Sequence, residues 1–303
     1  MTEAISYVSI ATVEPARWLA LCGDVMGMSV VGDELVPGDL YGHGGSVRRL
    51  MLAQEPLRTG MIQLLAFDPP VHESWLAGAV PLDTGYIRTV DVFTSDHAEA
   101  SSRLAANGFR FRRGPHTYDA GQGMTATEGF VDAPDGVTFA VLQMRGAPRE
   151  TFCRGTALFG ELGASSHVVE SMEDELRFWR AAFGFDVHYD FHYSGAATPA
   201  GLLELPVGAG LRMTVVAAPG ANTAKLARME YTAKGRSLAG QARPPRRGLV
   251  SHGFLARAAD VEAAGGRLEA APRRVPLAPF GEVELSVASS PCGVRLELFW
   301  PVG

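Results

Sequence analysis

The sequence predicts an α+β fold built from four copies of one module, in which a strand is followed by a helix and three further strands. Two repeats carry this prediction. Glycines that follow a helical pattern recur at separations of 81, 76 and 82 residues, at Gly27, Gly108, Gly184 and Gly266. A longer repeat of 157 residues relates Ala133–Val137 to Ser290–Val294, and also Gly27 to Gly184. The chain is therefore expected to consist of two halves with two modules each.

The helix of the third module has the clearest pattern. Ser171 is a good N-cap residue, and Gly184 stands where a helix ends in the left-handed conformation. Between them, four apolar residues fall on one stripe of a helix, namely Met172, Leu176, Trp179 and Phe183. Weaker copies of this pattern predict the other three helices, at residues 14–26, 95–107 and 258–264.

Strands are expected between the helices. Residues 201–205 and 211–216 are examples, because both runs are rich in apolar residues and lie between turn signals. Residues 145–160 combine glycine, proline and arginine and are expected to link the two halves. The predicted domains are residues 1–147 and residues 160–303.

The composition is that of an ordinary globular protein, with 47% hydrophobic and 20% charged residues among 303. The net charge of −6 argues against general nucleic-acid binding. No apolar run approaches the ~20 residues of a membrane span. The three cysteines form no zinc or redox motif, so a cytoplasmic location is expected.

A carboxylate inside the last predicted strand is the first candidate for a functional site. Glu297 lies in an apolar run that follows the turn Pro291–Gly293. A buried carboxylate is costly unless it is paired or bound to a metal. The third and fourth modules also share two patterns: Ser-His at His167 and His252, and Arg-x-Glu at Glu230 and Glu297.

Four such modules, with His252-Gly253-Phe254 opening one and Pro291-x-Gly293-x-x-x-Glu297 closing it, resemble the vicinal oxygen chelate superfamily. Its members include glyoxalase I, methylmalonyl-CoA epimerase, extradiol dioxygenases and bleomycin-resistance proteins. The resemblance implies two tandem glyoxalase-like domains, each a curled mixed sheet that forms a cup with helices outside. It implies metal ligands on the first and last strands of paired modules, which places the metal at His167, Glu230, His252 and Glu297.

Two imidazoles and one or two carboxylates suit a divalent transition metal such as iron, manganese, nickel, cobalt or zinc. A lone histidine in a strand is usually a core or surface residue, but two at matching places favour a metal site. The N-terminal half is expected to bind no metal. The place of Glu297 is taken there by Ala140, and the opening strands contain no histidine.

Three functions follow from the resemblance. The first is a metal-dependent lyase or isomerase of the glyoxalase type, in which the metal polarises a substrate oxygen and stabilises an enolate, with Glu230 or Glu297 as the base. The second is an Fe(II) extradiol ring-cleaving dioxygenase, although residues 211–216 and 284–288 lack the histidine or tyrosine expected there. The third is a small-molecule binding or resistance protein, a group that typically lacks the metal ligands.

Further candidates lie in the third module and in the loop after it. Strand alternation places Tyr189 and Tyr193 on one face of residues 187–193 and His192 on the other. We expect the two tyrosines to line the substrate pocket, with Tyr193 and His192 as further catalytic candidates, although packed aromatics and a solvated histidine explain the pattern equally well. Arg246 lies in a basic loop that is either a clamp for an anionic substrate or a solvated connector. A small-molecule substrate and a monomer or homodimer are expected.

Overall fold

The computed structural model describes residues 4–56, 58–112, 114–121, 123–146, 157–194, 200–221 and 223–302. Within these residues it contains four modules of the expected strand and helix order, so the predicted α+β class is confirmed. The predicted linker at residues 145–160 lies largely outside the described part of the chain. Whether residues 1–147 and 160–303 are separate domains stays a prediction.

The first two modules supply eight strands and two main helices. The first contains β1 (Tyr7–Thr12), α1 (Pro15–Leu19), β2 (Ser29–Pro37), β3 (Ser46–Ala53) and β4 (Met61–Asp68), with a π-helical continuation of α1 at Ala20–Val25. The second contains β5 (Tyr86–Thr94), α2 (His97–Ala106), β6 (His116–Gly121), β7 (Met124–Asp132) and β8 (Thr138–Arg145).

The last two modules repeat this order. The third contains β9 (Phe159–Val168), α3 (Met172–Phe183), β10 (Asp186–Tyr193), α4 (Ala200–Leu203), β11 (Leu211–Ala217) and β12 (Lys225–Tyr231). The fourth contains β13 (Gly248–Leu255), α5 (Ala258–Ala263), β14 (Arg267–Leu277), β15 (Gly281–Ser289) and β16 (Arg295–Pro301). The strand expected at residues 201–205 is wrong, because the helical turn α4 occupies residues 200–203.

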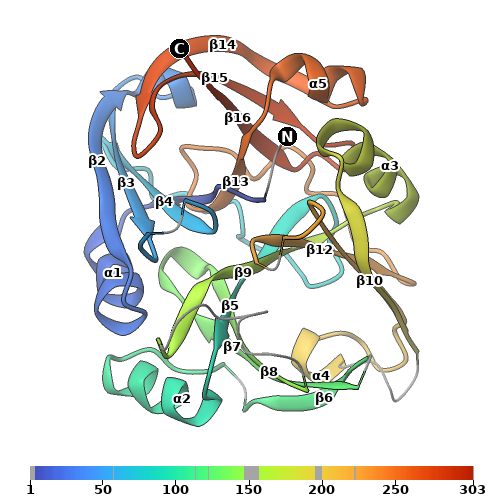
Figure 1. The fold of residues 1–303 in the computed structure, drawn as a ribbon. Helices are drawn as coiled ribbons and strands as arrows, with labels where there is room; N and C mark the ends of the chain where they lie inside the picture. Colours follow the sequence, from blue (N-terminus) through green and yellow to red (C-terminus); the bar gives the residue numbers. More distant parts are fainter. Residues whose placement is uncertain are drawn as a thin grey trace.

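The strands form two eight-stranded mixed sheets that combine modules across the two halves (Figure 1). The first sheet has the order β14-β15-β16-β13-β1-β4-β3-β2 and joins the first module to the fourth. The second sheet has the order β10-β11-β12-β9-β5-β8-β7-β6 and joins the second module to the third. The opening strands β1 and β13 pair antiparallel in one sheet, as β5 and β9 do in the other. The C-terminal half therefore does not close a cup from its own two modules.

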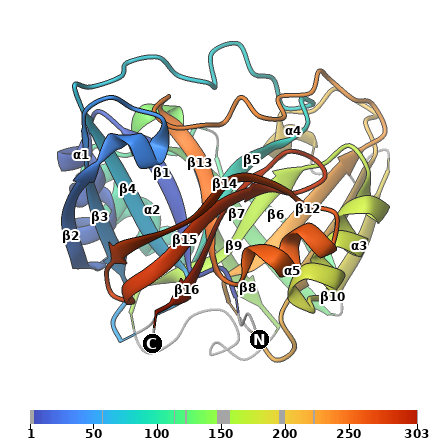
Figure 2. The same cartoon turned by 90° about the horizontal axis from the view of Figure 1, so that it is seen from above.

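Helices cover the outside of the sheets, with α1 on one side of the molecule and the packed pair α3 and α5 on the other (Figure 2). The hydroxyl of Ser171 caps α3, and Gly184 ends it at φ 68°, so the predicted helix is confirmed. Met172, Trp179 and Phe183 of its apolar stripe are buried, and Leu176 is partly buried against the same core. Among the described residues, no helix has the length and apolar composition needed to cross a membrane.

Candidate functional site

The two histidines predicted as metal ligands meet in the core between the sheets. His167 comes from β9 of the second sheet and His252 from β13 of the first, and both are fully buried. Their rings stack with centroids 4.5 Å apart, and Nε2 of His167 lies 3.1 Å from Nδ1 of His252. The hydroxyl of Ser165 lies 2.9 Å from Nε2 of His252. The pair thus joins the two sheets.

Burial and a neighbouring buried cation both disfavour protonation of this histidine pair. The guanidinium of Arg228 is fully buried, lies 4.5 Å above the Trp179 ring and is 3.5 Å from the carboxylate of Glu175. Burial, followed by the charge of Arg228, lowers the pKa of His167 and of His252 well below the ordinary value.

Glu297 lies on the opposite face of the first sheet from His252. On β16 it is in register with Gly253, the neighbour of His252 on β13, and successive residues of a strand point to opposite faces. Its carboxylate accepts hydrogen bonds from the hydroxyls of Tyr7 at 3.0 Å and Ser251 at 2.5 Å. A Cβ on Gly253 would lie 2.2 Å from the Tyr7 ring, so only glycine lets this tyrosine reach the carboxylate.

Glu230 lies apart from the other three predicted ligands. It is half-buried on β12, and its carboxylate accepts a hydrogen bond from Lys234 at 3.4 Å. Within the described ranges, no group of three or more His, Cys, Asp and Glu side chains could hold a metal ion. The structure therefore brings the two histidines together but does not assemble them with Glu230 and Glu297.

The remaining predicted residues separate into surface positions and cavity positions. The side chain of His192 is 72% exposed and lies 3.8 Å from Asp190. Arg246 is partly exposed and forms an ion pair with Glu73 at 3.1 Å. Tyr189 and Tyr193, in contrast, line a cavity in the second sheet.

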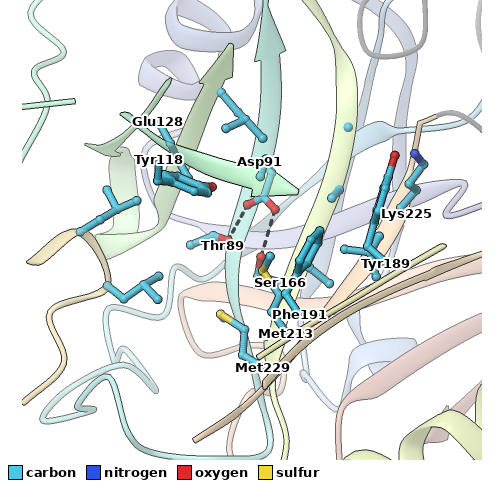
Figure 3. A pocket seen from close by; sticks show the side chains of 18 of the residues that line it. Thr89, Asp91, Tyr118, Glu128, Ser166, Tyr189, Phe191, Met213, Lys225 and Met229 are labelled. Atoms are coloured by element: carbon cyan, nitrogen blue, oxygen red, sulfur yellow. Dashed lines mark hydrogen bonds between the residues drawn. The ribbon is translucent and has the colours of Figure 1, made fainter. Parts of the chain in front are cut away.

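This cavity lies in the cup of the second sheet, and side chains from all eight of its strands line it (Figure 3). Its volume of about 130 Å³ is close to the ~150 Å³ of an engineered cavity that binds benzene. On β10, the ring of Phe191 lies between two tyrosines: it stacks on Tyr189 with centroids 5.7 Å apart and is tilted relative to Tyr193 at 6.0 Å. Four other strands, β7, β8, β11 and β12, each add one methionine, namely Met124, Met144, Met213 and Met229.

Two carboxylates interrupt these apolar walls. Asp91 of β5 accepts hydrogen bonds from Thr89 at 2.6 Å and from Ser166 at 3.0 Å, and Glu128 of β7 accepts one from Tyr118 at 2.6 Å. Burial raises the pKa of Asp91 to about 6. Burial, together with the nearby charge of Asp91, raises the pKa of Glu128 to about 7. Both groups therefore titrate close to neutral pH.

Comparisons with known proteins identify the architecture. No family model and no curated protein matches the sequence. Among solved structures, maize glyoxalase I aligns over 99% of this chain and 92% of its own, with a TM-score of 0.65 and 13% identity. A Bacillus subtilis protein provisionally named a dioxygenase aligns over 100% of this chain and 86% of its own, with a TM-score of 0.60 and 12% identity. The chain has the vicinal oxygen chelate fold. At these identities the likeness concerns the fold alone.

In this vicinal oxygen chelate fold, the cup of the first sheet contains Glu297. The side chains in that cup do not suit the transition metal expected from the sequence. Glu297 is joined there by the hydroxyls of Ser9 and Ser251 and by the amide of Gln63, one group from each of four strands. With the hydroxyl of Tyr7, which also bonds to Glu297, the group has one carboxylate, three hydroxyls and an amide, and it lacks the imidazoles that such a metal favours. Apolar side chains around Phe299 fill the space beside this group.

Each predicted histidine lies one residue after the serine that faces the cup, and this explains why the histidines do not meet Glu297 there. The two Ser-His pairs do occupy matching places, but Ser251 and Ser166 face the cups, bonded to Glu297 and Asp91, while the histidines face the core. A one-residue change reverses the face of every side chain in a strand. Sequence reasoning also missed Asp91, although it is a carboxylate in an apolar strand just as Glu297 is.

Proposed function

We propose that this protein binds a small, mainly apolar molecule with a flat ring in the cup of the second sheet. The observation that carries the proposal is the cavity itself, which all eight strands line and to which every strand except β9 contributes aromatic or methionine side chains. Ligand sites are usually such concave apolar spaces with a few placed polar groups. The adjacent rings of Tyr189, Phe191 and Tyr193 offer a flat ligand a wall for aromatic contact.

This proposal corresponds to the third function expected from the sequence, a binding or resistance protein. The metal-dependent lyase or isomerase and the ring-cleaving dioxygenase share the fold, and glyoxalase I is one of the similar structures. Both reactions need a metal centre, and the side chains of the two cups do not provide the expected ligand set. Binding requires only the cavity.

Filling the cavity tests the proposal. Ala227 lines it from β12, and we expect Ala227→Phe to weaken binding of tert-butylbenzene at least tenfold, because the new ring occupies the space of the ligand. Calorimetric titration of the full chain measures the affinity. Val207→Phe is the matched control, since Val207 is fully exposed and its substitution leaves the cavity unchanged. Failure of the unmodified protein to bind tert-butylbenzene, or equal binding by both variants, contradicts the proposal.

The metal content provides a second, independent prediction. Because His252 faces the core, and the described part of the chain places no third His, Cys, Asp or Glu side chain with it and His167 in a metal-binding group, His252→Ala is expected to leave the amount of bound Fe, Mn, Ni, Co and Zn unchanged. Elemental analysis of both proteins after equal metal loading measures this. Loss of one equivalent of metal in the variant would restore the metal-dependent enzyme as the better explanation.

A further inference from the structure

Two carboxylates and a row of aromatic rings line the same cavity. Asp91 and Glu128 extend into the cavity from β5 and β7, and the rings of Tyr189, Phe191 and Tyr193 line it from β10. Figure 3 shows Glu128 with Tyr118 on one side of Asp91, and Tyr189 with Lys225 on the other. Neither carboxylate has a basic side chain as a hydrogen-bond partner in the described residues.

We infer that the ligand of this cavity is an organic cation, in which an ammonium or similar nitrogen centre is attached to an aromatic or apolar body. The positive centre lies near Asp91 and Glu128, and the body lies against the rings of β10. This inference rests on the proposed function and names the class of ligand that the same cavity takes.

The hydrogen bonds of the carboxylates leave room for such a ligand. A carboxylate has about four lone-pair positions, and the hydroxyls of Thr89 and Ser166 use two of those on Asp91. Glu128 accepts one hydrogen bond, from Tyr118. The hydroxyls hold both carboxylates in place without neutralising them. The nearby charge of Arg88 partly offsets that of Glu128, but its guanidinium donates hydrogen bonds to Tyr231 and to two carbonyls. A cationic ligand would therefore supply the direct charged partner that both carboxylates lack among the described residues.

The surrounding walls favour an organic cation over an inorganic one. Small hydrated ions need several oxygen ligands, whereas this cavity is mainly apolar. Aromatic faces attract cations that have lost part of their water, and this is how proteins recognise quaternary ammonium groups. A cation already lies over this wall, since Nζ of Lys225 is 5.8 Å from the centre of the Tyr189 ring.

Two cationic side chains, Arg88 and Lys225, also line the cavity, and their charges would repel a cationic ligand. Arg88 is held by the hydroxyl of Tyr231 at 2.6 Å and by the carbonyls of Pro81 and Leu203. Lys225 lies beside Tyr189, and burial lowers its pKa. The other titratable groups of the lining are the phenols of Tyr118, Tyr189 and Tyr193. Removal of the Lys225 charge should therefore strengthen binding of a cation.

The test compares two probes of the same shape, phenyltrimethylammonium and tert-butylbenzene, by calorimetric titration of the full chain at pH 8. We expect the cation to bind at least tenfold more tightly than the neutral probe. Asp91→Asn/Glu128→Gln should remove this preference without weakening the neutral probe, and Lys225→Met should strengthen the cation about threefold. Asp33→Asn/Asp39→Asn is the control for charge, because it removes two exposed carboxylates outside the cavity, one on β2 and one in the 3-10 turn that follows it.

The outcomes separate this inference from the proposed function. Equal binding of both probes by the unmodified protein, or an unchanged preference in Asp91→Asn/Glu128→Gln, overturns the inference and leaves the binding function intact. Binding of neither probe overturns both. The cation affinity should also fall at least tenfold between pH 8 and pH 5, since protonation of Asp91 and Glu128 removes the attraction, and a pH-independent preference argues against it.

Discussion

Replacing Arg228 by alanine is expected to lower the free energy of unfolding by about 3–5 kcal/mol, as is typical when one partner of a buried ion pair is removed. Arg228 is fully buried beside Glu175, and the carboxylate of Glu175 also accepts hydrogen bonds from Nε1 of Trp179 at 2.7 Å and from the backbone of Cys292 at 3.0 Å. The substitution leaves this carboxylate buried without its cation and leaves a cavity under Trp179. Urea unfolding followed by circular dichroism measures the loss.

An exposed ion pair of the same helix is the control for this prediction. Arg177 and Asp174 lie 2.9 Å apart on the surface of α3, and Arg177→Ala should cost less than ~1 kcal/mol. The combination Arg228→Met/Glu175→Gln should cost less than the sum of the two single changes, because neither charge is then left alone. Equal losses for Arg228→Ala and Arg177→Ala would show that the buried pair contributes no more than a surface pair.

In a variant without the cavity carboxylates, the free energy of unfolding is expected to fall steeply as the pH is lowered into the mildly acidic range. His167 and His252 have lowered pKa values in the folded protein, so below about pH 6.5 the unfolded chain binds protons that the folded chain does not. Two such groups reduce the free energy of unfolding by up to ~2.7 kcal/mol per pH unit as the pH falls. Asp91→Asn/Glu128→Gln is expected to follow this slope between about pH 6 and 5.

The unmodified protein should change much less over the same range, because its carboxylates act in the opposite direction. The pKa values of Asp91 and Glu128 are raised to about 6 and 7 in the folded protein, so the folded chain takes up protons first and gains stability as the pH falls. The two contributions nearly cancel between about pH 6 and 5. Urea unfolding of both proteins at half-unit pH steps measures the two slopes, and parallel curves would refute this account.

The local elements were predictable because their signals lie within a few residues. The Ser171 cap, the apolar stripe of α3 and Gly184 all belong to one helix, and the structure forms that helix as expected. The 157-residue repeat likewise identified the module, since each copy must build the same turn and closing strand. The helical turn α4 was missed because a short apolar run fits a strand and a helix equally well.

The faces of the strands were not predictable in the same way. Strand β9 is buried along almost its whole length, so its sequence shows no alternation that would separate the side of Ser166 from the side of His167. Both members of each Ser-His pair were possible cup residues, and choosing the histidines placed the predicted ligands on the core face, whereas the serines face the cups. The pairing across modules then placed His252 and Glu230 in different sheets.

The sequence by itself determined the four modules, the order of their strands and helices apart from the helical turn α4, and the position of each closing turn, because these depend on interactions between near neighbours in the chain. Only the tertiary structure decided that the first module joins the fourth and the second joins the third, and that serines rather than histidines face the cups. The physical reason is that strand pairing brings together residues far apart in the sequence, and a strand buried on both faces carries no local signal for the side that becomes concave.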